Sequence, residues 1–339
     1  MLEKPNLLDE KHITCLQNAY GLLVNRIDFL PLGADVNTAV YRVVAEDDKA
    51  YFVKLRRGAF NKTSVALPKL LSEQGIEQII APLASSTGQL WANLEAFKVI
   101  LYPFIEGQDG YEVNLSDRHW GQFGTALKRF HSAAIPSALV SRIREEKYSA
   151  QWREIVKFFL ARVEIDSFDD PTAVKLAAFL NSRREEILDL VARADRLALA
   201  LQVQSPEFIV CHSDIHAGNI LVGANDALYI VDWDEPILTP KERDLMYIGS
   251  GLLGDWYSAA EEETLFYQAY GQTQIDPTAI AYYRYERIVQ DIAEFCKQLL
   301  LSNDGGEDRE RSLHYLKSNF LPNSTIDIAY QSDKTAREY

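Results

Sequence analysis

The chain has 339 residues, of which 47% are hydrophobic and 25% are charged, so it can form about two domains with a sizeable core. Its 49 acidic and 35 basic residues give a formal net charge of −14, which argues against a nucleic-acid-binding surface and suits a cationic small molecule. Three widely separated cysteines exclude a disulfide framework and a CxxC metal motif. Since no signal-peptide core or membrane-spanning apolar run is present, we expect a cytoplasmic protein without a membrane partner.

The first hundred residues contain mainly strand patterns, in which apolar residues alternate or form short runs between turns. The expected elements are strands over 37–45, 50–55, 89–94 and 96–104 and a short helix over 63–72. Pro68 should kink or end that helix, because proline lacks the N–H that a helix interior needs.

After residue 105 the periodicity becomes helical, and the glycine-containing segment 106–110 is the best domain boundary. Helices are expected over 116–132, from the cap at Asp170 to about Leu201, and from the cap at Asp276 to about Leu301. The polar stretch from Pro322 should be loosely packed. We therefore predict an α+β protein with a strand-rich nucleotide-binding lobe over 1–105 and a larger catalytic and substrate-binding lobe over 106–339.

Three oxygen-bearing side chains in residues 208–234 suggest phosphoryl transfer. Asp214, in His-Ser-Asp, is followed five residues later by Asn219, and Asp232 ends the apolar stretch 228–231. Asp214 could receive the proton of an attacking hydroxyl, while Asn219 and Asp232 offer the hard oxygen ligands that Mg²⁺ prefers. The alternative for Asp232 is an ordinary aspartate at the end of a strand. Asp234 either assists the metal or stabilises the turn before Pro236.

Two neighbouring residues are expected to support the loop rather than the chemistry. His212 should brace it by hydrogen bonding to the backbone or to Asp232, and Cys211 should be a small buried residue that ends a strand.

Lys54 lies in the otherwise apolar stretch 51–55, where it either extends to solvent or contacts phosphate oxygens. The loop at 31–38 could cover those phosphates with backbone N–H groups and with Gly33, Asn37 and Thr38. The connector at 102–107 could bind adenine through its backbone, with apolar contacts from its side chains. Its candidate nucleotide contacts are Tyr102, Phe104 and Ile105.

These motifs together resemble the aminoglycoside phosphotransferase family. The residues that carry the resemblance are Lys54, the 102–106 connector, Phe130-His131, His212-Ser-Asp-Ile-His-Ala-Gly-Asn219 and Asp232-Trp-Asp234. Within that family the chain is most similar to the members that phosphorylate spectinomycin, over 148–156, 210–219, 232–236, 240–246, 282–289 and 291–293.

The resemblance implies a two-lobed, protein-kinase-like fold that uses ATP and magnesium. It implies that Asp214 is the catalytic base, that Asn219 and Asp232 bind Mg²⁺, and that Lys54 contacts the α- and β-phosphates. Ser213 replaces a glycine that is common in this loop, a change that a negative φ would tolerate. No glutamate on the helix expected over 63–72 is an obvious partner for Lys54, and Glu73 lies too late.

The implied acceptor is a hydroxyl of a cationic aminocyclitol antibiotic such as spectinomycin, which suggests a role in antibiotic resistance. Its amines favour a pocket with carboxylates, for which Asp234, Asp291 and Glu294 are candidates. For Asp291 and Glu294, an (i, i+3) pair on an expected helix, a solvated helix face is the alternative.

Three other functions stay open or less favoured. A kinase for choline, ethanolamine or a sugar would share the catalytic groups, and a non-catalytic nucleotide-binding pseudokinase would share the fold. A protein kinase is disfavoured, because only eight residues separate Asp232 from Lys241 and leave no room for a peptide-docking segment.

Overall fold

The computed structural model describes residues 4–33, 37–254, 256–302 and 306–338, which form two compact units. Unit 1 comprises Met1–Ile143, Ala217–Pro236 and Gln268–Gly271, and unit 2 comprises Arg144–His216, Ile237–Tyr267 and Gln272–Tyr339. Unit 1 extends past the expected boundary at residue 105, because β6 (Gly107–Asp109) pairs with β9 (Ile220–Gly223). The sheets and helices of the two units confirm the α+β class.

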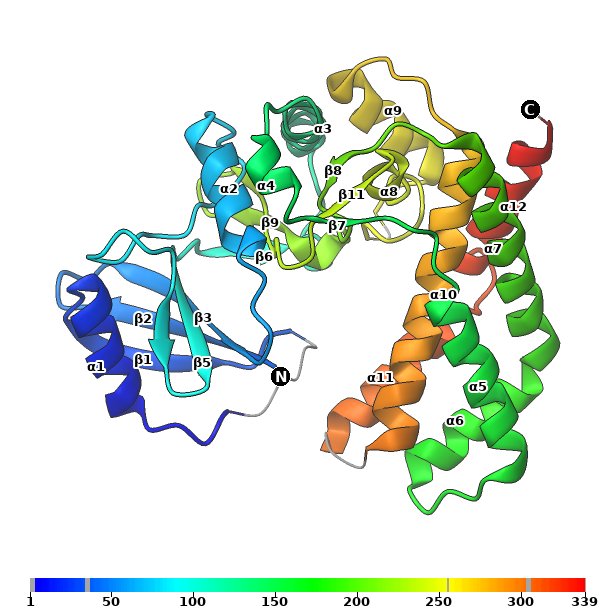
Figure 1. The fold of residues 1–339 in the computed structure, drawn as a ribbon, viewed down its shortest axis with the longest axis horizontal. Coiled ribbons are helices and arrows are strands. Elements are labelled where there is room, and N and C mark those ends of the chain that lie inside the picture. The colour runs from blue at the N-terminus through cyan, green and yellow to red at the C-terminus, as the bar shows by residue number, and fades with distance from the viewer. Residues whose placement is uncertain (1–3, 34–36, 255, 303–305, 339) are drawn as a thin grey trace. The chain divides into compact units, whose positions relative to one another are not determined.

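A five-stranded antiparallel sheet forms the amino-terminal part of unit 1, with the order β1-β2-β3-β5-β4 (Figure 1). Its strands are β1 (Val24–Leu30), β2 (Thr38–Ala45), β3 (Ala50–Arg57), β4 (Ala92–Leu94) and β5 (Phe97–Pro103). The strands expected over 37–45, 50–55 and 96–104 are thereby confirmed. The strand expected over 89–94 is shorter, at three residues.

The two faces of this sheet have different surroundings. One face packs against the helix α1 (Asp9–Tyr20) (Figure 1). The sequence pattern, which indicates mainly strands in this region, did not predict this helix. Leu16 of α1 joins Tyr41, Val53 and Leu101 in a fully buried cluster. Because side chains alternate along a strand, Lys54 projects from the opposite face.

The remaining elements of unit 1 are short helices and a second small sheet. They are α2 (Thr63–Glu73), α3 (Asp117–His131), α4 (Ser137–Val140), the 3₁₀ turn η1 (Ala217–Asn219) and the sheet β10-β9-β6, in which β10 is Leu228–Ile230. Pro68 lies inside α2 rather than ending it. The ring is itself buried beside Leu67 and Leu71, so apolar burial offsets the lost hydrogen bond.

Unit 2 is mainly helical and is built around the long helix α10 (Pro277–Leu301), against which α5, α7 and α12 pack (Figure 1). The other helices are α5 (Gln151–Ile165), α6 (Pro171–Ser182), α7 (Arg184–Gln204), α8 (Glu242–Leu245), α9 (Ala259–Tyr270), α11 (Gly306–Ser318) and α12 (Thr325–Glu338). A three-stranded sheet joins β7 (Arg144–Glu145), β11 (Ile237–Thr239) and β8 (Ile209–Cys211). None of the helices, within the part of the chain described, combines the length and apolar content that a membrane span requires.

The helix starts in unit 2 follow the sequence signals. The side chain of Asp170 accepts a hydrogen bond from the N–H of Ala173, and that of Asp276 accepts one from the N–H of Thr278, each at 2.8 Å. Proline follows each cap at the first helical position. The single helix expected from residue 170 to about 201 is wrong, because Arg183 has φ −110° and ψ 11° and separates α6 from α7.

The polar carboxyl-terminal stretch is packed, contrary to the expectation for residues after Pro322. Asp333 of α12 has a fully buried side chain that forms ion pairs with Arg193 and Arg196 of α7 and with Arg337. Three guanidinium groups therefore compensate one buried carboxylate and hold α12 in place.

Candidate active site

Lys54 of β3 forms ion pairs with two carboxylates that follow β10. Its Nζ lies 2.9 Å from Oδ1 of Asp232 and 2.8 Å from Oδ1 of Asp234. Arg56, on the same face of β3, lies 3.0 Å from Oδ2 of Asp234 and donates to the hydroxyl of Thr38 at 2.7 Å. The structure thus brings together the predicted residues Lys54, Asp232, Asp234 and Thr38. The partners of Lys54, which the sequence left unassigned, are the two aspartates.

The charge state of Lys54 depends on this pairing. The side chain is only 10% exposed, and burial alone would lower the Lys54 pKa. The carboxylates of Asp232 and Asp234 outweigh burial and raise the pKa above its usual value, so Lys54 stays protonated. Glu73, the acidic residue at the end of α2, is instead paired with Lys69 at 3.1 Å.

The two candidate magnesium ligands lie at one end of the β9–β10 hairpin. Asn219 directly precedes β9, and its backbone carbonyl accepts a hydrogen bond from the N–H of Val231 at 3.0 Å. Asp232 follows Val231 and has φ +63°, an unusual conformation for a residue with a side chain. An amide oxygen and a carboxylate are hard donors of the kind that Mg²⁺ prefers, so the chemistry of these two residues fits the ion.

The connector residues begin on the sheet face that carries Lys54. Tyr102 pairs with Phe52 in the β3–β5 ladder, and burial raises the pKa of its hydroxyl, with the charges of Lys54 and Asp234 acting in opposite directions. The N–H of Phe104 donates to the carbonyl of Ala50 at 3.2 Å. The ring of Phe104 lies under the guanidinium of Arg42, 5.0 Å from its centroid.

Only part of the predicted phosphate loop can be placed. Gly33 has φ +84°, a conformation that favours glycine, and Thr38 begins β2. Asn37 precedes β2, and its carbonyl accepts a hydrogen bond from the N–H of Arg57 at 2.8 Å. Ala34, Asp35 and Val36 lie outside the described residues.

Asp214, the predicted base, belongs to unit 2 and is paired with an arginine. Its Oδ1 lies 2.5 Å from Nη1 of Arg287 and 3.2 Å from the hydroxyl of Tyr247, and its Oδ2 lies 3.7 Å from Nε2 of His216. Burial would raise the Asp214 pKa, but Arg287 and His216 lower it well below its usual value. The carboxylate is therefore ionised at neutral pH.

The loop that carries Asp214 is held by its own backbone contacts. Nδ1 of His212 accepts a hydrogen bond from the N–H of Asp214 at 3.3 Å, which confirms backbone bracing by His212. The buried carboxylate of Asp244 accepts hydrogen bonds from the N–H groups of His212 at 2.9 Å and Ser213 at 2.6 Å. Ser213 has φ +74°, so the condition of a negative φ, under which serine would be tolerated in place of glycine, is not met. The loop needs a left-handed residue at this point.

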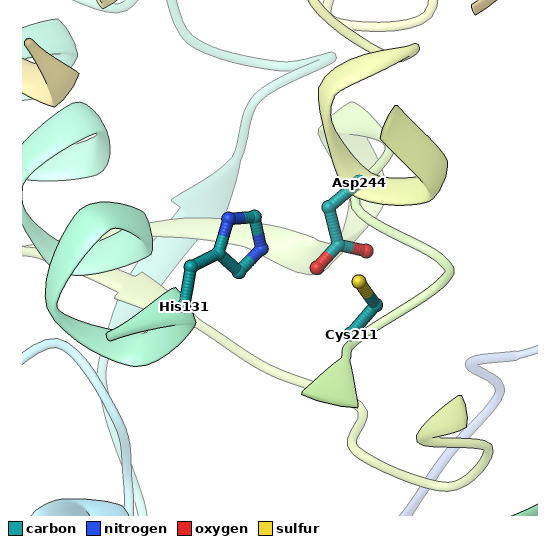
Figure 2. Close-up of side chains that lie close together, drawn as sticks. All are labelled: His131, Cys211 and Asp244. Carbon is teal, nitrogen blue, oxygen red and sulfur yellow. The ribbon is translucent and has the colours of Figure 1, made fainter. Parts of the chain in front are cut away.

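Cys211 is a structural residue, as predicted. Its side chain is fully buried, and its sulfur lies within 4.8 Å of a carboxylate oxygen of Asp244 on α8 (Figure 2). Burial, together with the charge of Asp244, raises the thiol pKa well above its usual value. The group is therefore an unreactive thiol near neutral pH.

The two candidate acceptor contacts on α10 have different surroundings. Asp291 is 21% exposed and lies 2.9 Å from Nε of Arg287. Burial raises the Asp291 pKa to about 6, against the opposing effect of Arg287. Glu294 is exposed and accepts a hydrogen bond from Gln290 at 3.0 Å. Arg287 thus links Asp291 to Asp214, and no motif in the sequence indicated that role.

Comparison with known proteins gives a match over most of the chain. The model of the phosphotransferase enzyme family matches residues 28–284. The comparison with curated proteins found no match.

Solved structures cover nearly the whole chain. Spectinomycin phosphotransferase, APH(9)-Ia, in complex with ADP and spectinomycin is 38% identical, with a TM-score of 0.90 over 97% of this chain and 99% of that one. Its AMP-bound complex is 37% identical, with a TM-score of 0.84 over 95% and 98%. An aminoglycoside phosphotransferase from Alicyclobacillus acidocaldarius subsp. acidocaldarius DSM 446, 13% identical with a TM-score of 0.62 over 99% and 98%, shares the fold.

Proposed function

Because the chain belongs to the phosphotransferase enzyme family, whose members are kinase-type transferases, we propose that it phosphorylates a hydroxyl of spectinomycin or a closely related cationic aminocyclitol, with ATP as donor. The pairing of Lys54 with Asp232 and Asp234 is the observation that supports phosphoryl transfer as the reaction type. The choice of acceptor rests on the similarity to the enzyme whose crystal structure holds ADP and spectinomycin.

Unit 1 supplies the groups that would hold the nucleotide. Lys54, kept protonated on the face of the sheet opposite α1, would contact the phosphates. Gly33, Asn37 and Thr38 would cover them. The connector residues Tyr102, Phe104 and Ile105 would bind adenine.

Asn219 and Asp232 would hold Mg²⁺, which supplies charge neutralisation at the phosphate oxygens. The existing ion pair between Asp232 and Lys54 would then be shared with the metal. Joint binding of Mg²⁺ and phosphate would account for the position of Lys54, on β3, beside Asp232, which follows the β9–β10 hairpin.

Asp214 would orient the acceptor hydroxyl and receive its proton. In the reaction the hydroxyl oxygen forms a bond to the γ-phosphorus, and the bond from that phosphorus to the β–γ bridging oxygen breaks. ADP leaves with the bridging oxygen, and the hydroxyl proton ends on the carboxylate. Because the Asp214 pKa is low, proton transfer would come late, after most of the charge has moved.

A cationic acceptor would be attracted by the carboxylates of unit 2. Asp291 and the exposed Glu294 are separated by one turn of α10, and the whole chain carries a net charge of −14. Asp234 was also a candidate acceptor contact. Its ion pairs with Lys54 and Arg56 instead favour a role beside the phosphates.

The proposed biological role is antibiotic resistance, in which the protein phosphorylates the antibiotic in the cytoplasm. Cys15, Cys211 and Cys296 are all free thiols, which is compatible with a reducing compartment.

Transfer of labelled phosphate from ATP to a panel of acceptors tests the function. The panel should contain spectinomycin, an aminoglycoside, choline, ethanolamine and a simple sugar, and spectinomycin should be the preferred acceptor by kcat/KM. Preference for choline, ethanolamine or the sugar would assign the chain to the metabolite kinases.

The variant Asp214→Asn supplies the control. It should still bind ADP with magnesium while transfer falls by about three orders of magnitude or more. Wild-type protein that binds nucleotide but phosphorylates nothing in the panel would support the pseudokinase alternative.

A further inference from the structure

Arg287 of α10 stands between two carboxylates of unit 2. Its Nη1 lies 2.5 Å from Oδ1 of Asp214, and its Nε lies 2.9 Å from Oδ1 of Asp291, one turn further along α10. The same Nη1 donates to the hydroxyl of Tyr247 at 3.0 Å. We call these four residues the Arg287 cluster.

The cluster fixes the Asp214 carboxylate through one of its oxygens. Arg287 and the Tyr247 hydroxyl both reach Oδ1, and that hydroxyl also lies 3.0 Å from the carbonyl oxygen of Ser213 in the same loop. A guanidinium is planar and presents its donors in a fixed fork, so two separate partners define its orientation. Asp291 therefore aims Arg287, and Arg287 in turn holds Asp214.

The charges around Asp214 come from several elements. Arg287 and Asp291 face it from α10, Tyr247 from the segment after α8, and His212 and His216 from its own loop. Arg287 is the strongest of the groups that lower the Asp214 pKa against the effect of burial. It thus keeps the carboxylate able to accept a proton.

We propose that Arg287 is a positioning residue for the phosphoryl-transfer reaction, which orients Asp214 toward the acceptor hydroxyl while Asp291 anchors the guanidinium. The inference rests on the proposed role of Asp214 as the base. It assigns Asp291 a second task besides attraction of a cationic acceptor.

Arg284, one turn before Arg287 on α10, provides a matched control. Its guanidinium donates to the carbonyls of Met246 and Ile248 at 3.1 and 2.7 Å and to the hydroxyl of Ser332 at 2.7 Å. It supports the same segment that carries Tyr247. None of these three partners is Asp214.

The test compares Arg287→Met, Arg287→Lys and Arg284→Met in the phosphate-transfer assay with the full chain. Arg287→Met should lower kcat by about 100-fold with a smaller change in the KM for ATP, since loss of base positioning affects the chemical step. Loss of the guanidinium should also move the acidic limb of the kcat/KM–pH profile to higher pH.

Arg287→Lys should lie between the wild type and Arg287→Met, because a lysine ammonium cannot reproduce the fork that reaches both carboxylates. Arg284→Met should keep the wild-type acidic limb. If Arg287→Met does not fold, the comparison of Arg287→Lys with the wild type tests the inference. A wild-type kcat and pH profile in Arg287→Lys would overturn the inference.

Failure of this inference differs from failure of the proposed function. If the wild type transfers no phosphate to any acceptor, the proposed function is wrong and Arg287 has no base to position. If the wild type is active and the Arg287 variants lose no more than Arg284→Met, with an unmoved acidic limb, Arg287 is merely structural.

Discussion

Asp244 accepts a 2.6 Å hydrogen bond from the N–H of Ser213, a residue held in the left-handed conformation at φ +74°. The side chain of Asp244 is fully buried, and the second of its bonds reaches the preceding N–H, that of His212. A buried acid on α8 therefore shapes the turn that leads into Asp214, and the turn adopts a backbone conformation that disfavours a side chain.

Replacement of Ser213 should separate backbone strain from the contacts of its hydroxyl. Ser213→Gly should be more stable than Ser213→Ala by about 1 kcal/mol, because both lose the hydroxyl but only glycine adopts φ +74° without strain. Urea unfolding of the two variants measures this difference. Equal stability would show that the turn relaxes to another conformation.

Removal of the Asp244 carboxylate should destabilise the protein. Asp244→Ala leaves the N–H groups of His212 and Ser213 without this acceptor, at a cost on the order of 3 kcal/mol, and Asp244→Asn should cost less. Thermal or urea unfolding provides the measurement. Asp308→Ala is the control, since that carboxylate forms a long ion pair with Arg311, at 4.0 Å. A loss no larger than in the control would contradict the bracing role.

Substitution of Asp234 distinguishes its two candidate roles. We expect Asp234→Asn to raise the KM for ATP several-fold with little change in the KM for the acceptor, because its partners are Lys54 and Arg56. Steady-state kinetics with each substrate varied in turn gives both constants. A rise confined to the acceptor KM would instead make Asp234 an acceptor contact.

Magnesium dependence tests the assignment of Asp232. Asp232→Asn should need about tenfold more Mg²⁺, or more, for half-maximal transfer, because a neutral amide is a weaker ligand than a carboxylate. Removal of divalent cations with EDTA should abolish transfer by the wild type, and added Mg²⁺ should restore it. Asp226→Asn, in the turn of the same hairpin, should keep the wild-type requirement. An unchanged requirement in Asp232→Asn would remove that residue from the metal site.

The raised Asp291 pKa predicts a pH dependence of stability. Between the unfolded value near 4 and the folded value of about 6, the folded protein holds a proton that the unfolded chain releases. The free energy of unfolding should therefore fall as pH rises through this window, by an amount on the order of 2 kcal/mol.

Asp291→Asn should reduce this fall, and the part that persists is expected from Glu286, whose pKa burial raises to about 7. Urea unfolding at pH 4.5 and 7 measures the fall, with Glu207→Gln, a substitution of an exposed carboxylate in the segment after α7, as control. The same slope in Asp291→Asn and in the control would mean that another group titrates in this range.

Local signals in the sequence predicted much of the fold. Asp170 and Asp276 announced their helices, since an N-cap followed by proline depends only on adjacent residues. The break at Arg183 was missed because it contains neither glycine nor proline, and helical periodicity continues on both sides. The packing of α12 was missed because the charge of Asp333 resembles that of a solvated residue until its arginine partners on α7 are known.

For the candidate site, too, the sequence predicted local features and missed long-range contacts. Lys54, Asp214, Asn219 and Asp232 stood out by spacing, because their motifs are short. Their partners did not. The ion pair of Lys54 with Asp232 spans 178 residues, and that of Asp214 with Arg287 spans 73. Such long-range pairs arise from tertiary packing, which no local pattern encodes.

The alternation in β3 limits how this lobe can vary in evolution. Val53 and Leu55 face the core closed by α1, while Lys54 faces the other way. One residue gained or lost within the strand before Lys54 would exchange the two faces, burying an ammonium group among hydrocarbon and exposing valine or leucine. Changes in length should therefore be confined to turns such as 46–49, and the strand itself should keep its length in every functional descendant of this gene.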